Sequence, residues 1–166
     1  MLVTDSYEYN NPREDRILSW DFIIENGEFS VGPATALGSP TLYQVESIQA
    51  DKHYQTLLVA EEMKEHHKVM VLDLMTGEVI KEDLGNFDRG NDPEGIALVI
   101  NKDNNGYWIC TEQSKTDNRF HLYDRKTLEY KTTMYLENVS YTDGIATAYM
   151  HGKWFLYAVD NDARVV

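Results

Sequence analysis

Acidic residues stand at matching places in three successive pairs of short apolar segments. Three acids open a segment with a β-strand pattern, and three others close the segment that follows: Glu46 and Glu62, Glu94 and Glu112, and Asp143 and Asp160. The opening acids are 48 and 49 residues apart. A period of about 40–50 residues is typical of propeller blades. The sequence therefore predicts a repeated β-architecture with acids at equivalent positions in each repeat.

The expected hairpins bring these acids together. In an antiparallel pair, the first residue of one strand lies beside the last residue of its neighbour. In a propeller the inner hairpins surround a central channel, so we expect Glu46, Glu94 and Asp143 near a common axis. Carboxylates gathered there repel one another unless a cation holds them. Hard divalent cations prefer such oxygen ligands, and the pattern therefore predicts a metal site.

The remaining segments complete the blades. Alternating apolar and β-branched residues bounded by Gly, Asn and Asp indicate strands joined by hairpins. Third strands are expected at 17–22, 69–74 and 120–125, each followed by a turn and a more polar fourth strand at 28–31, 78–81 and 129–132. No stretch has a convincing helical period. We therefore predict an all-β fold, a β-propeller of four-stranded antiparallel blades.

The strand pattern divides the chain into about three blades of one partial β-propeller domain over residues 1–166. We expect an incomplete blade at 1–43, complete blades at 44–91 and 92–140, and an incomplete blade at 141–166. Closed propellers usually have 4–8 blades. We therefore expect the chain to need further blades, or a partner, to close the propeller.

The composition excludes several classes of partner. The chain has 28 acidic and 15 basic residues and a formal charge of −13, so we expect it to bind neither nucleic acid nor an anionic membrane surface. No segment is long and apolar enough to span a membrane, and the first residues lack the pattern of a secretory leader. Cys110 is the only cysteine, which excludes an internal disulfide and leaves the cellular compartment unknown.

Several segments resemble β-propeller phytases, calcium-dependent enzymes that remove phosphate from inositol hexakisphosphate. The resemblance covers nearly the whole chain and matches the C-terminal half of that six-bladed fold. It rests on Gln44-Val45-Glu46-Ser47, Ala60-Glu61-Glu62, Asp92-Pro93-Glu94-Gly95, Gly106-Tyr107 through Gln113, Thr142-Asp143-Gly144-Ile145 and the upstream acid Glu137.

The resemblance implies a set of site residues and a cofactor. The expected calcium ligands are Glu46, Glu62, Asp92, Glu94, Glu137 and Asp143. Among them, Glu46, Asp92, Glu94 and Asp143 are the expected catalytic residues, and Gln113 is expected beside the bound phosphate. Clustered cations of this kind activate a water for attack on phosphorus. The resemblance also implies a phosphorylated small-molecule substrate and an extracellular or periplasmic location.

Beyond Asp160, the Asn-containing segment of the phytase pattern is not recognisable in Asn161-Asp162-Ala163-Arg164, and the sequence departs from the pattern in two further places. Val3-Thr4 is followed by Asp5-Ser6 where the family has a lysine, and Ser47 replaces a glycine. The basic residues that hold phosphate come mostly from the other half of the fold, and Arg13 and Arg16 are candidate substitutes. Two alternatives therefore stay open: a lactonase-like propeller hydrolase with one divalent cation, and a non-catalytic calcium-binding interaction module. We expect the pair His66-His67 to be a solvated loop tip, and His121 to have a packing role.

Overall fold

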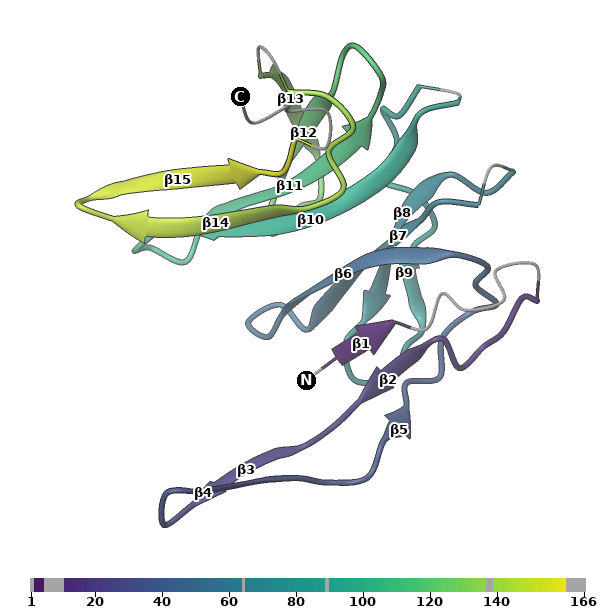
Figure 1. The fold of residues 1–166 in the computed structure, drawn as a ribbon, viewed down its shortest axis with the longest axis vertical. Coiled ribbons are helices and arrows are strands. Elements are labelled where there is room, and N and C mark those ends of the chain that lie inside the picture. Colours follow the sequence, from purple (N-terminus) through teal and green to yellow (C-terminus); the bar gives the residue numbers. More distant parts are fainter. Residues whose placement is uncertain (1, 5–10, 64, 89, 137–138, 161–166) are drawn as a thin grey trace.

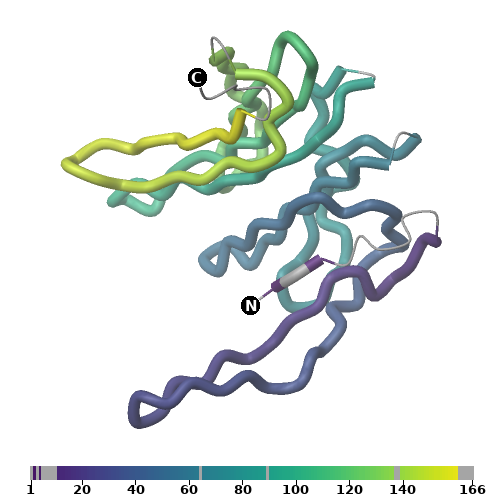
Figure 2. Tube along the Cα trace, in the orientation of Figure 1, coloured from purple at the N-terminus to yellow at the C-terminus, as the bar shows by residue number. Residues whose placement is uncertain are grey.

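The computed structural model describes residues 2–4, 11–63, 65–88, 90–136 and 139–160. All the regular secondary structure in these ranges is β-strand, arranged in five antiparallel sheets. The sheets fan out side by side (Figure 1), and the chain passes through them in sequence order except for one hairpin that is inserted within the first sheet (Figure 2). The described part of the chain contains no helix that is long and apolar enough to cross a membrane.

Two complete four-stranded blades form the centre of the molecule. The strands of the first blade are β6 (Val45–Asp51), β7 (Thr56–Glu61), β8 (Lys68–Asp73) and β9 (Val79–Lys81). Those of the second are β10 (Asp92–Ile100), β11 (Gly106–Gln113), β12 (Arg119–Asp124) and β13 (Tyr130–Tyr135). Each strand pairs with its sequence neighbours. The predicted all-β fold, with blades of a partial propeller, is confirmed.

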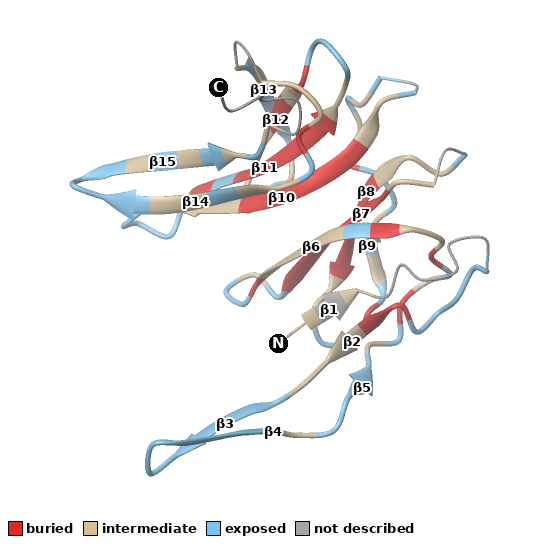
Figure 3. Ribbon diagram, viewed as in Figure 1, coloured by how far each residue is buried: buried red, intermediate tan, exposed pale blue. Residues whose placement is uncertain are grey.

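Two hydrophobic layers hold the blades together, and β7 contributes to both. Leu58 and Ala60 pack with residues of the second blade, including Trp108 and Cys110. Leu57 and Val59 point the other way and pack with Ile17, Leu42 and Met70. This alternation follows from the two-residue period of a strand. The inner blade strands carry most of the buried residues (Figure 3). Each fully buried Val, Leu, Ile, Phe or Met side chain contributes about 1.5–3 kcal/mol to stability.

The same turn chemistry closes the outer hairpin of both blades. Asp73 ends β8, and its carboxylate accepts hydrogen bonds from the backbone N–H groups of Met75 and Thr76. Asp124 ends β12 and accepts from Lys126 and Thr127 in the same way. An aspartate that bonds the backbone two and three residues later stabilises a turn locally. The repeated aspartate therefore fixes where each third strand ends.

The N-terminal sheet differs from the prediction. It consists of β1 (Leu2–Thr4), β2 (Ile17–Ser19) and β5 (Thr35–Ala36), in the order β1-β2-β5. The expected fourth strand at 28–31 is β4 (Glu28–Val31), which pairs with β3 (Phe22–Glu25) in a separate hairpin. The two-residue turn at Asn26 and Gly27, both with positive φ, closes this hairpin tightly. Because the chain returns only at Thr35, β5 takes the place beside β2.

The β3–β4 hairpin extends away from the blades as an arm (Figures 1 and 3). Its large apolar side chains are exposed: Phe22, Ile23, Ile24, Phe29 and Val31. At the other end of the fan, β14 (Ile145–Met150) and β15 (Lys153–Ala158) form a two-stranded sheet. Residues 161–166, the end of the incomplete blade expected at 141–166, lie outside the described residues.

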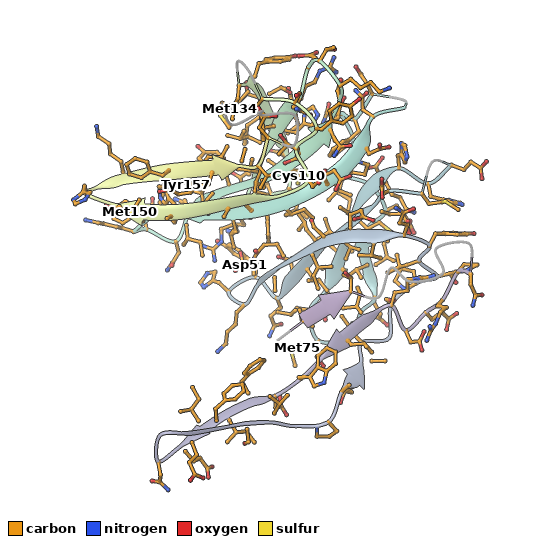
Figure 4. All side chains as sticks on the ribbon, viewed as in Figure 1. Asp51, Met75, Cys110, Met134, Met150 and Tyr157 are labelled. Carbon is orange, nitrogen blue, oxygen red and sulfur yellow. The ribbon has the colours of Figure 1, made fainter. Side chains whose placement is uncertain are left out.

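A buried ion pair connects the two complete blades at the far end of the inner strands from Glu46. Asp51, the last residue of β6, accepts two hydrogen bonds from Arg125, at 2.5 Å from Nε and 2.7 Å from Nη2. Both side chains are 2% exposed. Arg125 also donates to the carbonyl of Asn104 and lies over the ring of Tyr54. Figure 4 shows Asp51 at this end of β6. The pair fixes one blade against the next.

Candidate metal and phosphate centre

Glu46 and Glu62 lie at the end of the β6–β7 pair that is opposite its connecting turn, beside a bulge in the β6–β7 ladder. The pairing shifts between Val45 and Ser47, so Glu46 lies in the bulge. Glu62 follows β7, and its N–H donates to the carbonyl of Gln44. The side chain of Gln44 joins the two acids, because its Nε2 donates to Glu46 Oε1 at 3.0 Å and also to Glu62. Bulges commonly redirect side chains at functional sites.

Glu94 lies in a second bulge, near the start of β10. The next residue, Gly95, lies against the start of β14. A Cβ atom there would lie 2.8 Å from the backbone nitrogen of Ile145 and 3.2 Å from the carbonyl oxygen of Asp143. Glycine therefore allows the strands that carry Glu94 and Asp143 to approach each other.

Ser47, which stands where the phytase pattern has a glycine, forms a hydrogen bond between two blades. Its hydroxyl donates to the backbone carbonyl of Glu94 at 2.6 Å. The serine thus forms a hydrogen bond between β6 and β10, next to Glu46 on one strand and at Glu94 on the other. The substitution of glycine by serine at this position is compatible with the close approach of the two blades.

Asp92 and Asp143 complete the group from the second and third repeats. Asp92 pairs with Gln113 across β10 and β11. The Gln113 amide in turn donates to Asp143 Oδ1. Asp92 also has a partner from the first blade, since His67 Nε2 lies 3.1 Å from Asp92 Oδ1. The side chain of His67 is only 12% exposed, so the prediction of a solvated histidine tip is wrong for this residue.

Charge repulsion couples the five acids to one another. Burial, then the Glu46 carboxyl, and then the charges of Asp92 and Asp143 raise the pKa of Glu62 to about 8. Burial, then repulsion from Glu62, Glu46, Asp143 and Asp92, raises the pKa of Glu94 to about 9. Like charges disfavour ionisation of a neighbour only at short range. The structure therefore brings together Glu46, Glu62, Asp92, Glu94 and Asp143 from three successive repeats.

The cluster is not a closed coordination shell. Among the described residues, no three His, Cys, Asp or Glu side chains form a ready metal-binding group. Side-chain donors instead engage the carboxylates: Gln44 on Glu46 and Glu62, Gln113 on Asp143, and His67 beside Asp92. Its donor set nevertheless suits a hard divalent cation, which takes several oxygen ligands, and a positive charge would relieve the repulsion that raises the two pKa values.

Two of the acids that close expected strands have other partners. Glu112 is buried, and its carboxylate bonds His121 Nε2 at 2.6 Å and Asn91 Nδ2 at 2.5 Å. Burial alone would raise the pKa of Glu112, but these hydrogen bonds outweigh it and hold the pKa below its usual range. Asp160 lies 3.4 Å from the N–H of Ser140. Each acid thus holds the segment that enters its own blade.

The remaining predicted residues have these positions. Glu137 lies outside the described residues. Arg16 is fully buried and donates to the carbonyls of Leu42 and Asn11, and Arg13 pairs with Asp15. Both arginines therefore have structural partners. His121 is buried between Glu112 and Thr133, consistent with a packing role.

A pocket lies beside the acid cluster. Its volume is about 340 Å³, and Asp92, Gln113, Lys115 and Tyr141 are among its lining residues. Within the described part of the chain, Lys115 has no ion-pair partner. The pocket therefore offers a cationic group and amide donors next to carboxylates, a combination that suits a phosphorylated ligand bound together with a cation.

Sequence reasoning gave no site role to Gln44 or His67. Gln44 had a detectable signal, because it opens the Gln44-Val45-Glu46-Ser47 segment on which the phytase resemblance rests. His67 had none, since only the fold of the β7–β8 loop brings it to Asp92.

Comparison with known proteins supports this assignment of the fold. A search of curated proteins found no match. The family model described as Phytase matches residues 23–152, which span most of the chain and include the five clustered acids and Gln113. Family membership indicates a phosphatase activity of the phytase type. The chain belongs to the phytase family.

Proposed function

We propose that the acid cluster is the calcium- and phosphate-binding centre of a phosphomonoester hydrolase that releases phosphate from inositol hexakisphosphate. The observation that carries the proposal is the crowding of five carboxylates from three repeats, which raises the pKa of Glu62 to about 8 and that of Glu94 to about 9. Without a bound cation this arrangement destabilises the folded state, because repulsion between the carboxylates and their burial both oppose folding.

The residues present suit calcium. All five are carboxylates, and Ca²⁺ takes six to eight oxygen ligands in flexible geometry. We propose Glu46, Glu62, Asp92, Glu94 and Asp143 as the ligands, with Glu137 as a further candidate. Bound calcium would supply the positive charge that attracts phosphate oxygens and lowers the pKa of a water.

The chain's own residues have distinct roles in this proposal. Gln113 holds Asp143 and faces the pocket, where its amide N–H groups can also donate to a phosphate oxygen. Gln44 keeps the Glu46 and Glu62 carboxyls beside each other. Glu94 retains its proton at neutral pH without a cation, because its pKa is about 9, and it releases that proton when positive charge enters the site.

A complete active centre needs more basic groups than the blades of this chain provide. The substrate is strongly anionic and the chain has a formal charge of −13, so electrostatic repulsion opposes binding. We propose that further blades, or a partner, close the propeller and supply most of the phosphate-binding lysines and arginines.

The test is phosphate release from inositol hexakisphosphate by the complete protein, in which further blades or a partner close the propeller. Release is measured with calcium and with a chelator. We expect release with calcium only, and a loss of at least about 100-fold for Glu94→Gln, because a metal ligand is removed. Glu82→Gln is the matched control, since Glu82 is exposed and, among the described residues, its carboxylate pairs only with Lys68. Release that persists in chelator, or equal rates for Glu94→Gln and Glu82→Gln, would overturn the proposal.

A further inference from the structure

We propose that His67 is a positioning residue that orients the Asp92 carboxylate for calcium across the boundary between two blades. This inference rests on the proposed function. Its observation is the contact of 3.1 Å between His67 Nε2 and Asp92 Oδ1, made by a side chain that is 12% exposed. The histidine comes from the loop between β7 and β8 of the first blade, and the aspartate begins β10 of the second.

The backbone that carries Asp92 is already fixed. Asp92 pairs with Gln113, and Pro93 pairs with Glu112, across β10 and β11. The preceding residue, Asn91, is held by its 2.5 Å hydrogen bond to the buried Glu112. What this network leaves free is rotation of the Asp92 side chain about its own bonds.

His67 restricts that rotation. With its proton on Nε2, the imidazole donates to Oδ1 and leaves Oδ2 for a cation. Among the described residues, no other side chain hydrogen bonds to Asp92. The loss of this donor would therefore leave the carboxylate with several rotamers beside the other acids of the cluster, and repulsion among the charged carboxylates favours orientations that point away from it. Groups that hydrogen bond to ligating carboxylates commonly change metal affinity by about 10–100-fold when they are mutated.

The neighbouring histidine provides a matched control. His66 stacks on Tyr43, with ring centroids 4.2 Å apart, and among the described residues it forms no hydrogen bond or ion pair with the cluster acids. Since both histidines lie in the same loop, His66→Leu disturbs loop packing without removing the bond to Asp92. His67→Leu removes that bond at similar volume, and His67→Gln keeps an N–H donor near the position of Nε2.

The experiment is calcium titration of the intact protein by calorimetry, with crystal structures of the metal-free wild type and His67→Leu. We expect calcium affinity to fall about 10–100-fold in His67→Leu and by less than about 3-fold in His67→Gln and His66→Leu. The metal-free His67→Leu structure should show Asp92 in a different rotamer.

Three results would overturn the inference: unchanged affinity in His67→Leu, an equal loss in His66→Leu, or an unmoved Asp92 carboxylate. A wild-type protein that binds no calcium would refute the proposed function, and with it the role of His67 in calcium binding. The metal-free structures distinguish this failure from a failure of the positioning itself, because they show whether His67 orients Asp92 even when no calcium binds.

Discussion

Neutralising Glu94 should stabilise the metal-free protein at neutral pH while abolishing much of its stabilisation by calcium. Glu94 is buried among four other acids, which raises its pKa to about 9 from the usual 4.5. Between these two pH values the unfolded chain loses the Glu94 proton while the folded protein keeps it. The folded state then binds more protons, so stability falls as pH rises.

The magnitude follows from the width of that window. At pH 7 the pH is about 2.5 units above the unfolded pKa, and one unit corresponds to about 1.4 kcal/mol. The ionisable group therefore costs at most about 3.5 kcal/mol at pH 7, and residual solvation reduces this to about 1–3 kcal/mol. Glu94→Gln removes the ionisable group at nearly constant shape. The gain should become small at pH 4.5, where Glu94 is protonated in the folded state and about half protonated in the unfolded state.

Urea unfolding of wild type and Glu94→Gln in chelator, at pH 4.5 and 7, measures this difference. The same pair with calcium gives the opposite order, because the wild type then gains binding energy that the variant lacks. Glu82→Gln, on the surface, should change neither result. A Glu94→Gln variant that is less stable than wild type at pH 7 in chelator would refute the reasoning, since it would show that Glu94 is not held against its neighbours' charge.

Four further results are expected. Calcium at 100 times its dissociation constant should stabilise the intact wild-type protein by about 2.7 kcal/mol, and Glu46→Gln should reduce the resulting shift in melting temperature. Calcium binding at pH 7 should release about two protons, one each from Glu62 and Glu94, as measured by calorimetry in buffers of different ionisation enthalpy; no release would contradict the raised pKa values. Arg125→Met should cost about 3–5 kcal/mol in urea unfolding, because it leaves Asp51 buried and unpaired, whereas Arg125→Met combined with Asp51→Leu should cost much less. The 166-residue chain alone should release phosphate from inositol hexakisphosphate far more slowly than a closed propeller; equal turnover would show that no further blades are needed.

The 48- and 49-residue spacing predicted that Glu46, Glu94 and Asp143 lie at equivalent points of successive repeats. Repeats with equal strand order place equivalent residues at equivalent points, and Glu46, Glu94 and Asp143 follow this rule. The β6–β9 and β10–β13 blades could also be predicted from the sequence, since apolar and polar residues alternate along their strands and their turns carry aspartates. These features are local in sequence and can be interpreted without knowledge of the fold.

Other features depended on contacts that no local pattern contains. Glu112 has the sequence position of a cluster acid, but a histidine on the next strand binds it instead. His67 reaches Asp92 only because the β7–β8 loop leans toward the next blade. The first sheet was mispredicted because segment 28–31 has a good strand pattern, and the pattern does not say which strand it pairs with.

The β3–β4 arm gives the protein an exposed ribbon whose sequence favours self-association. Segment 22–24 is Phe-Ile-Ile, and Ile24 is 75% exposed. Short apolar segments with high β-propensity and unpaired edges are templates for intermolecular strand addition. The charged residues at the tip, Glu25 and Glu28, flank the Asn26-Gly27 turn and act as gatekeepers that make this addition less favourable. The solubility of the chain during expression and storage should therefore depend more on these two glutamates, and on anything that covers the arm, than on the stability of the blades.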